Sequence, residues 1–424
     1  MSKQTFVIVG ASLAGGKAAE TLRDLGFEGR VVLIGSEPER PYQRPPLSKD
    51  YLSAKVGLEK VYLHAEDFYA SHEIELRTAT TVERIEPGSS EVVLAGGERL
   101  GYDRLLLATG AEPRRLSLPG ADLDEIYYLR TLPDSERLRE RIERGGKLVV
   151  VGAGWIGCEV AAAARQAALE VTVIDPSSVP LEHVLGVEMG AIYRDIHTDH
   201  GVEMLLGTGV DAFEGDRRVE RVRTSDGRVI DCDFVVAGIG AIPRTELAAG
   251  TKIVVYDGLL TNQHLETEVE GIFAAGDVAN ARHPLFGGLR VEHWSNALHQ
   301  GPTAARNMLG GADANDPVLD HPVAYDRIPY FYSDQYDVGM EYSGHAPAWD
   351  EVVIRGDVAG REFIAFWLKD ERILAGMNVN VWDVPAQIQA LIRSHLRVDR
   401  DRLADPSTPL TELAPDREVS HVER

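Results

Sequence analysis

The stretch GAGWIGCE at residues 152–159 carries a complete G-x-G-x-x-G pattern, formed by Gly152, Gly154 and Gly157. It stands between two short apolar runs, and the second run ends on Asp175. A strand, a tight glycine turn and a helix that begins at the turn bind the pyrophosphate of a dinucleotide. An acid at the end of the second strand binds the ribose 2′-hydroxyl and repels a 2′-phosphate. The stretch therefore predicts a Rossmann-like unit that prefers NADH to NADPH.

A related pattern occurs about 140 residues earlier, in GASLAG at residues 10–15. Ser12 replaces the middle glycine, but a strand-like run precedes the turn, a helix-forming run follows it, and Glu37 takes the acidic position. Two such units in one chain require two dinucleotides, or one dinucleotide used twice.

Two shorter turns support a pairing of FAD with NAD(P)H. The run at residues 104–107 leads into Ala108-Thr109-Gly110, and the run at 272–274 leads into a turn with Gly276 and Asp277. Either turn alone is common, but this order around a second G-x-G-x-x-G is specific. Strands that alternate with helices indicate parallel, doubly wound sheets.

The fold class expected is α/β, with two Rossmann-like dinucleotide-binding domains and a C-terminal α+β domain. We expect a discontinuous FAD-binding domain at residues 1–109 and 238–318, with an NAD-binding domain at 110–237 between its parts. Aromatic residues and alternating runs indicate the α+β domain at 319–404. The polar residues 405–424 are expected to form a loosely held tail.

Composition and charge exclude several classes of function. The net charge of −23 argues against nucleic acid as a partner. Cys158 and Cys232 are far apart, so no disulfide framework, redox dithiol, or Cys-ligated zinc or iron–sulfur site is expected. The histidines lack metal-ligand spacing, so no metal site is predicted. Short apolar runs and the absence of a signal-peptide pattern predict a cytoplasmic protein without a membrane segment.

The order of these turns resembles the flavoprotein reductases with two dinucleotide-binding domains. Within them, the chain is most similar to the oxygenase-coupled NADH–ferredoxin reductases of the putidaredoxin reductase type. The resemblance covers roughly residues 5–400 and rests on five further motifs: RPPLSKDYL at 44–52, YLRTLPD at 128–134, AGIGAIPRTEL at 237–247, VEHWSNALHQG at 291–301 and YFYSDQY at 330–336.

The resemblance implies a set of FAD-binding residues. The pyrophosphate would lie on the first turn, at Gly10, Ser12, Ala14 and Gly15, and the adenosine ribose on Glu37. Arg130 would contact the phosphates and Asp277 the ribityl chain. Trp294 would lie at an edge of the flavin, or alternatively fill a gap in the core. The remaining implied FAD-binding positions are Arg44, Lys49, Val82, Ala108, Thr109, Gly110, Gly276 and Glu292.

The resemblance also implies an NADH site at Gly152, Gly154, Ile156, Gly157, Asp175 and Gly238. Three residues would act at the flavin. Lys49 would pair with Glu159 close to it, unless the two form an ordinary surface pair. Trp155 would occupy the nicotinamide pocket until NADH displaces it, unless it packs against a helix.

The function implied is FAD-dependent transfer of electrons from NADH to a small acidic [2Fe–2S] ferredoxin that serves a P450 or Rieske oxygenase. Hydride transfer needs proximity and stacking rather than a catalytic Cys or His. The absence of Cys at positions 40–55 argues against the dithiol branches of the superfamily. A rubredoxin reductase, an NADH oxidase-like enzyme and an apoptosis-inducing-factor-like binding protein remain alternatives. The protein would be a monomer or a dimer.

An acidic reductase needs a local basic patch to meet an acidic ferredoxin. We expect that patch among Arg290, Arg393, Arg397, Arg400 and Arg402. The alternative is that these arginines pair with acids of the chain itself.

Overall fold

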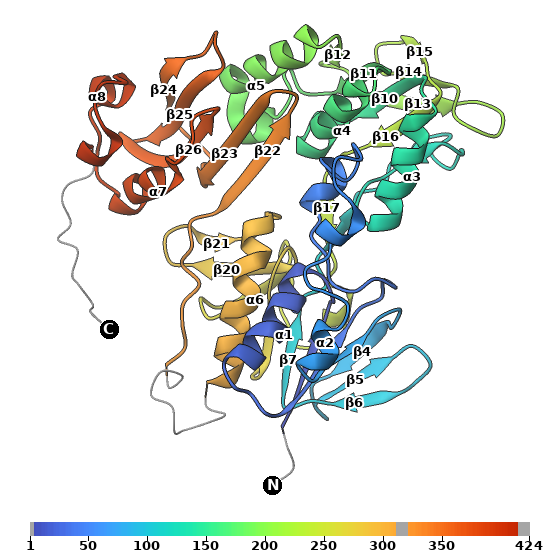
Figure 1. The fold of residues 1–424 in the computed structure, drawn as a ribbon, viewed down its shortest axis with the longest axis vertical. Coiled ribbons are helices and arrows are strands. Elements are labelled where there is room, and N and C mark those ends of the chain that lie inside the picture. Colours follow the sequence, from blue (N-terminus) through green and yellow to red (C-terminus); the bar gives the residue numbers. More distant parts are fainter. Residues whose placement is uncertain (1–3, 311–320, 414–424) are drawn as a thin grey trace. The chain divides into compact units, whose positions relative to one another are not determined.

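The computed structural model describes residues 4–310 and 321–413. The chain forms two compact units, Met1–Asp326 and Arg327–Arg424 (Figure 1). In the described ranges, no helix has the length and apolar character needed to cross a membrane.

The first sheet of unit one is entirely parallel and has the strand order β19-β7-β1-β2-β3. Its strands are β1 (Thr5–Val9), β2 (Arg30–Ile34), β3 (Ile74–Arg77), β7 (Arg104–Leu107) and β19 (Ile272–Ala274). The order reverses between β1 and β7, and this switch point is where α/β sheets bind ligands. The predicted strands at residues 5–9, 104–107 and 272–274 are confirmed.

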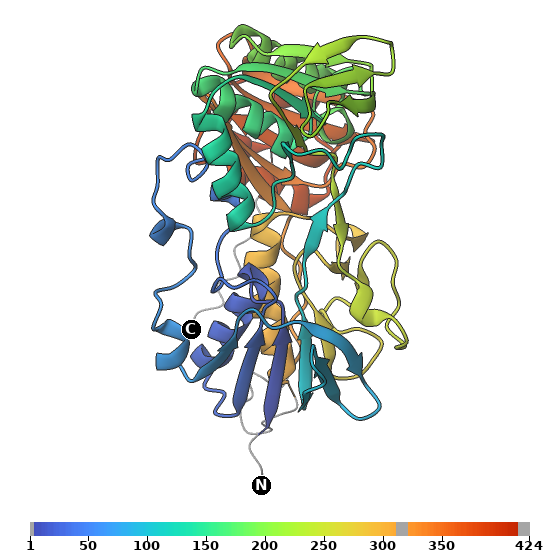
Figure 2. The ribbon, with the colours of Figure 1, turned by 90° about the vertical axis from the view of Figure 1, so that its right-hand side faces the viewer.

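Both faces of this sheet are covered, which explains its continuous apolar strands. Phe6 and Ile8 pack with α1 (Leu13–Asp24) and α6 (Trp294–Leu309). Val7 and Val9 pack on the other side, against the small sheet of β4 (Val82–Glu86), β5 (Glu91–Leu94) and β6 (Arg99–Gly101). Figure 2 shows the strands of the first sheet in the lower half of the picture and those of the second sheet in the upper half.

The second sheet repeats this plan, in the order β12-β11-β10-β16-β9. Its parallel strands are β9 (Ile126–Tyr127), β10 (Lys147–Val151), β11 (Glu170–Asp175), β12 (Glu203–Leu206) and β16 (Phe234–Ala237). Its helices are α3 (Leu132–Glu143), α4 (Trp155–Gln166) and α5 (Glu182–Asp199). Val149, Val151 and Ile174 pack against the small sheet of β13 (Val210–Glu214), β14 (Arg221–Thr224) and β15 (Val229–Asp231).

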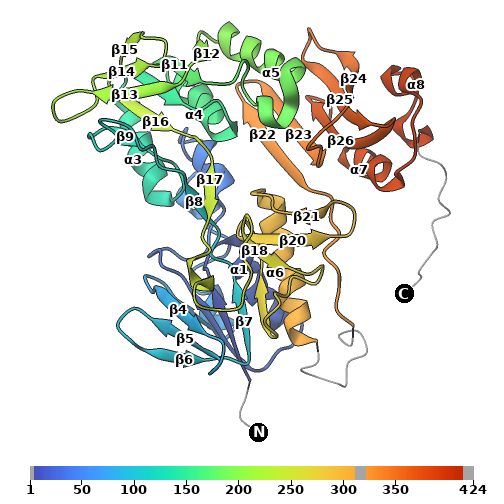
Figure 3. The same cartoon turned by 180° about the vertical axis from the view of Figure 1, so that it is seen from behind.

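Two short strands connect the parallel sheets. β8 (Ala111–Pro113) and β17 (Ala241–Pro243) pair antiparallel, as Figure 3 shows between the two sheets. Unit one also contains α2 (Phe68–Ser71) and a mixed sheet of β18 (Leu259–Thr261), β20 (Ala279–His283) and β21 (Gly287–Leu289).

Unit two is an antiparallel sheet in the order β22-β23-β26-β25-β24. Its strands are β22 (Tyr330–Gln335), β23 (Val338–Gly344), β24 (Glu351–Asp357), β25 (Glu362–Lys369) and β26 (Arg372–Val379). Helix α7 (Pro385–Ser394) contacts β23 and β26, and α8 (Arg400–Ala404) contacts β24. The expected α/β fold class with a C-terminal α+β part is confirmed.

The chain divides into its two units after Asp326, and the Tyr325 amide donates to the Gln263 carbonyl. The expected bounds of the FAD-binding, NAD-binding and C-terminal domains stay a prediction. The expectation of a loose tail from residue 405 is wrong for residues 405–413. Arg355 donates to the carbonyl oxygens of Pro406 and Thr408, and Leu410 is buried. Residues 414–424 lie outside the described ranges.

Candidate dinucleotide sites

The first glycine turn lies where β1 and β7 end side by side. A Cβ on Gly10 would stand 2.0 Å from the Ala108 carbonyl oxygen, and one on Gly15 would stand 2.0 Å from the carbonyl oxygen of Gly10. Gly10 also has a φ of +120°, which side chains avoid. Thr109 follows Ala108, and its hydroxyl donates to the Arg244 carbonyl at 2.7 Å. Close packing of the turn on the end of β7 therefore requires glycine at positions 10 and 15.

The helix that follows this turn begins under tight packing as well. Ser12 is the N-cap of α1. A Cβ on Gly276 would meet the Cβ of Ala14 at 3.2 Å, and one on Gly301 of α6 would meet the Ala14 carbonyl oxygen at 2.2 Å. The structure therefore brings Ser12, Ala14 and Gly276 together at one edge of the first sheet.

Glu37, just after the end of β2, is the centre of a half-buried polar cluster. Arg44 Nη2 donates to Glu37 Oε1 at 2.8 Å, and the Tyr42 hydroxyl donates to the other carboxylate oxygen. Burial alone would raise the pKa of Glu37, but Arg44 and the Tyr42 hydrogen bond lower it overall. Glu37 is therefore an ionised carboxylate at neutral pH.

Arg130 and Asp277 meet from distant parts of the chain. Arg130 Nη2 lies 2.7 Å from Asp277 Oδ2, next to the backbone of Gly110. The Arg130 Nε is buried and has no hydrogen-bond partner. A buried guanidinium N–H without an acceptor is costly, so it marks a place where a ligand oxygen fits.

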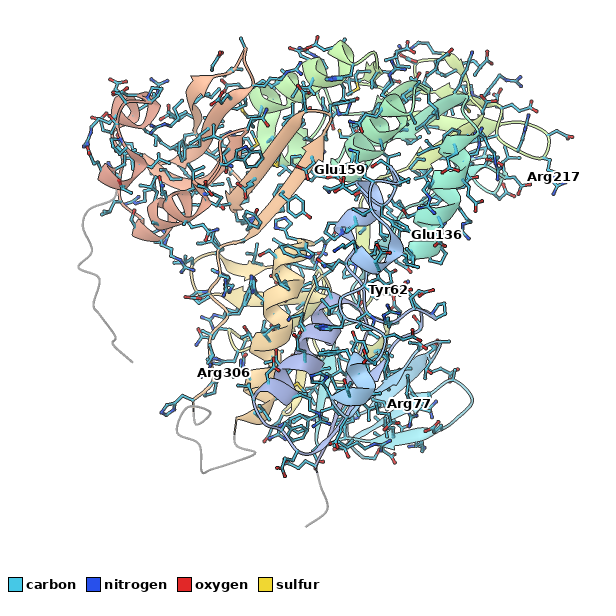
Figure 4. The ribbon with its side chains drawn as sticks, in the orientation of Figure 1. Tyr62, Arg77, Glu136, Glu159, Arg217 and Arg306 are labelled. Carbon is cyan, nitrogen blue, oxygen red and sulfur yellow. The ribbon has the colours of Figure 1, made fainter. Side chains whose placement is uncertain are left out.

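Lys49 and Glu159 form an ion pair in which Lys49 Nζ lies 2.7 Å from Glu159 Oε1. The side chains are only 11% and 3% exposed, so the pair is buried rather than an ordinary surface pair. Ser48 completes it, because its hydroxyl donates to Glu159 Oε2 at 2.5 Å. Figure 4 labels Glu159 on α4, which contacts the segment that carries Ser48 and Lys49. This contact joins the first glycine unit to the second.

The second glycine turn lies where β10 and β16 end. A Cβ on Gly152 would stand 2.4 Å from the Gly238 carbonyl oxygen, and one on Gly157 would stand 2.0 Å from the carbonyl oxygen of Gly152. A Cβ on Gly154 would meet nothing within 4 Å. Ile156, which follows, is 41% exposed. The middle of this turn is therefore open to a ligand.

Asp175 holds the second turn through backbone amides. It accepts a hydrogen bond from the Ala153 amide at 2.7 Å and another from the Ser177 amide at 2.7 Å. Each carboxylate oxygen retains a lone pair for a further donor. The carboxylate is therefore fixed at the end of β11, where the sequence predicts the ribose of NADH.

The two tryptophans lie at helix starts. Trp155, the first residue of α4, packs edge-on against Tyr193 of α5, with ring centroids 5.8 Å apart. This is the helix packing that the sequence left open as an alternative, and the nicotinamide gate stays a prediction. Trp294 begins α6, and its Nε1 donates to Gln43 Oε1 at 3.1 Å.

These residues fit two dinucleotides. The first dinucleotide site offers Arg130 Nε as an unused donor, and the second dinucleotide site offers the open face of Gly154 beside a fixed carboxylate. At the first turn, α6 packs closely against α1, and the Glu37 cluster is half-buried. The group at the second turn would remain accessible from solvent.

Comparison with known proteins decides the family. Residues 4–301 match the pyridine nucleotide-disulphide oxidoreductase family. The chain belongs to this family. Residues 330–414 match a second family, described as reductase C-terminal. The predicted flavoprotein reductase family is therefore confirmed, and FAD and NAD(H) are its cofactors.

Relatives narrow the family further. Putidaredoxin reductase of Pseudomonas putida is 36% identical over 97% of each chain. The ferredoxin–NAD(+) reductase component of the anthranilate 1,2-dioxygenase system of Burkholderia cepacia is 36% identical over 97% of this chain and 99% of its own. The reductase in the covalent putidaredoxin reductase–putidaredoxin complex superposes with a TM-score of 0.90 at 35% identity, over 97% and 98% of the two chains. The resemblance to oxygenase-coupled ferredoxin reductases is confirmed.

This member of the disulphide oxidoreductase family has no dithiol. Cys158 and Cys232 are both free and buried. Burial raises the pKa of each thiol, that of Cys232 to about 12. Both therefore behave as apolar core residues rather than as nucleophiles.

Three positions from the sequence analysis have a different setting from the others. Val82 is only 9% exposed and packs in the core under the first sheet, so only its backbone is available to a ligand.

Glu292 accepts from Arg290 Nη1 at 2.6 Å. Arg290 also pairs with Asp257 and its side chain is only 12% exposed, which contradicts its use in a basic docking patch. Intramolecular pairing, the alternative, holds here.

In unit two, Arg397 and Arg400 also pair within the chain, with Glu371 and Glu351 respectively. Their side chains remain 64% and 63% exposed, so they are still accessible to a partner.

Sequence reasoning missed four polar residues of these sites. The Tyr42 hydroxyl donates to Glu37, and the Gln43 side chain accepts from Trp294. The Ser48 hydroxyl donates to Glu159. The Gln300 side chain accepts from the Gly276 amide at 2.8 Å. Ser48 and Gln300 could have been found, since they lie within the RPPLSKDYL and VEHWSNALHQG motifs. Tyr42 and Gln43 carry no sequence signal, because tertiary contacts alone bring them to the sites.

Proposed function

We propose that the protein oxidises NADH at the second glycine turn and passes the electrons through FAD at the first turn to a [2Fe–2S] ferredoxin of an oxygenase system. One observation carries the proposal most directly. The buried Ser48–Lys49–Glu159 contact joins the start of the NADH-side helix α4 to the FAD-side segment. Hydride transfer between two dinucleotides requires this kind of proximity.

FAD supplies a group that accepts two electrons from NADH and releases them singly to a carrier. The chain's own residues hold and orient the two dinucleotides. The glycine turns bind the pyrophosphates, Glu37 and Asp175 bind the adenosine riboses, and Arg130 donates its unused N–H to the FAD phosphates. Lys49, held by Glu159, presents its ammonium to the flavin.

The absence of a dithiol supports outward transfer from FAD. Both cysteines are buried with raised pKa values, so electrons have no disulfide relay to enter. The named relatives are reductases of ferredoxin or putidaredoxin systems, which supports a ferredoxin as the acceptor. We place the reaction in the cytoplasm, where NADH is available. A P450 or a Rieske oxygenase would be the final enzyme.

The test is steady-state oxidation of NADH by the FAD-loaded protein with a panel of carriers. We expect cytochrome c reduction to depend on an added [2Fe–2S] ferredoxin, and ferricyanide reduction to proceed without one. Faster turnover with a rubredoxin than with every ferredoxin would contradict the proposal. A change in oligomeric state on NADH addition, with no carrier reduced, would instead favour a redox-dependent binding protein.

A further inference from the structure

The loop between β11 and α5, residues 175–182, carries two carboxylates that bind consecutive peptide amides. Asp175 Oδ1 accepts from the Ser177 amide at 2.7 Å. Glu182 Oε2 accepts from the Ser178 amide at 2.7 Å and from the Ser178 hydroxyl at 2.8 Å. Because neighbouring amides are separated by only one residue, the two carboxylates lie at the same turn of the loop.

Both ends of this loop are tied to the second glycine turn through Ala153. Its amide donates to Asp175 at 2.7 Å, and its carbonyl accepts from the Leu181 amide at 3.0 Å. Leu181 has a φ of 58°, a conformation that a leucine keeps only when its surroundings impose it. Leu181 is buried, and it directly precedes Glu182. The glycine turn therefore fixes the position of Glu182.

We propose that Glu182 is a second specificity-determining residue, which acts with Asp175 to exclude the 2′-phosphate of NADPH. The inference rests on the proposed use of this turn for NADH. An acid at the end of the second strand faces the ribose 2′ position in such units. A 2′-phosphate there would meet the charge of Asp175 and, across the Ser177–Ser178 dipeptide, that of Glu182.

Glu182 is ionised under working conditions. The hydroxyl and amide of Ser178 lower the pKa of its carboxyl below the ordinary value. Like charges a few ångströms apart at a protein surface repel measurably, and salt screens the repulsion. NAD⁺ and NADP⁺ share the pyrophosphate but differ at the 2′ position, so the charge of Glu182 repels NADP⁺ more strongly than NAD⁺.

The simpler role for Glu182 is structural. It is the first residue of α5 and stabilises the helix start by accepting from Ser178 and Val179. A residue that only holds the loop would affect NAD⁺ and NADP⁺ equally, because both place the same adenosine against it. The comparison of the two nucleotides therefore separates the roles.

The test uses calorimetric titration of the FAD-loaded protein with NAD⁺ and with NADP⁺. In Glu182→Gln we expect the affinity for NADP⁺ to rise about fivefold at low salt, and that for NAD⁺ to stay within about twofold. The gain should shrink at about 0.5 M salt, because screening removes the repulsion. Glu188→Gln is the matched control, since it removes the same charge from an exposed position on the same helix.

Three outcomes would overturn the inference. They are equal shifts for both nucleotides in Glu182→Gln, a gain that salt does not reduce, and an equal gain in Glu188→Gln.

Glu182→Asp keeps the charge and shortens the side chain, so it separates charge from loop geometry even where Glu182→Gln is poorly folded. We expect it to bind NADP⁺ as weakly as the natural chain does. NADP⁺ binding as tight as in Glu182→Gln would overturn the role of the charge. If the natural chain binds no NAD⁺ at all, the proposed function fails instead, which is a distinguishable result.

Discussion

The two glycine turns share one backbone geometry and differ in what surrounds them. In both, a Cβ on the last glycine would stand 2.0 Å from the carbonyl oxygen of the first glycine. Beside the first turn, Gly301 of α6 packs against Ala14, and the acid Glu37 accepts from the side chains of Tyr42 and Arg44. The second turn is open at Gly154, and its acid Asp175 accepts from the backbone amides of Ala153 and Ser177.

This difference matches two kinds of ligand. A turn with a second helix packed beside it and a half-buried ionic cluster suits a cofactor that stays bound through many turnovers. An open turn with a fixed backbone suits a nucleotide that enters and leaves in every cycle. The same local motif is therefore adapted by its surroundings.

The largest expected difference between the two turns follows from adding a methyl group to a glycine of each turn. Gly10→Ala places its Cβ against the Ala108 carbonyl at a positive φ, so we expect a loss of stability of at least about 3 kcal/mol and no retained FAD. Gly154→Ala meets open space, so it should keep FAD and weaken only NADH binding. Flavin absorbance after purification and NAD⁺ titration measure both effects. Retained FAD in Gly10→Ala would contradict the close packing of the first turn on the end of β7.

The Lys49–Glu159 contact within unit one gives the next largest effect. Lys49→Met leaves the carboxylate of Glu159 buried without its cation, and we expect a loss of about 3–5 kcal/mol in unfolding free energy. Lys55→Met is the control, because Lys55 is 59% exposed and lies 4.0 Å from Asp50. Urea denaturation measures both variants. Similar losses in the two would show that the buried pair does not stabilise the junction.

Ser48→Ala tests the smaller part of the same contact. It removes one hydrogen bond to Glu159 and keeps the ion pair, so we expect a loss of about 1–2 kcal/mol. Ser53→Ala is a suitable reference, since the Ser53 hydroxyl donates to the nearby Lys49 carbonyl. Equal denaturation midpoints for Ser48→Ala and the natural chain would show that the hydroxyl is dispensable.

Acid gives the smallest and most specific test of the first turn. The pKa of Glu37 is lowered in the folded chain, so its ionised cluster stabilises the fold above the unfolded pKa. That contribution is lost as pH falls through the folded pKa. Glu37→Gln should therefore lower the free energy of unfolding at pH 7. In acid, the free energies of unfolding of the variant and the natural chain should become more similar. A difference that is independent of pH would exclude this role of the carboxylate.

The sequence by itself determined the fold class and the two turns. Short-range rules produce these features: apolar runs form buried strands, and glycine is required where Gly10 and Gly152 adopt positive φ against a neighbouring strand end. The pairing of Lys49 with Glu159 was implied by resemblance, and the buried geometry agrees with it.

The pairing of charged side chains was less predictable from the sequence than the fold was. The net charge of −23 required a basic docking patch in the sequence argument, but the chain places Arg290 between Asp257 and Glu292. Sequence reports which charges exist, and only the folded chain decides which of them neutralise one another.

Only the tertiary structure decided which polar residues complete each site. Tyr42 reaches Glu37, Ser48 reaches Glu159 across 111 positions of sequence, and Leu181 ties its loop to Ala153. The physical reason is that a hydrogen bond depends on a separation of about 3 Å in space. Local patterns do not encode that separation for residues far apart in the chain, whereas the period of apolar residues and the need for glycine are local and can be read directly.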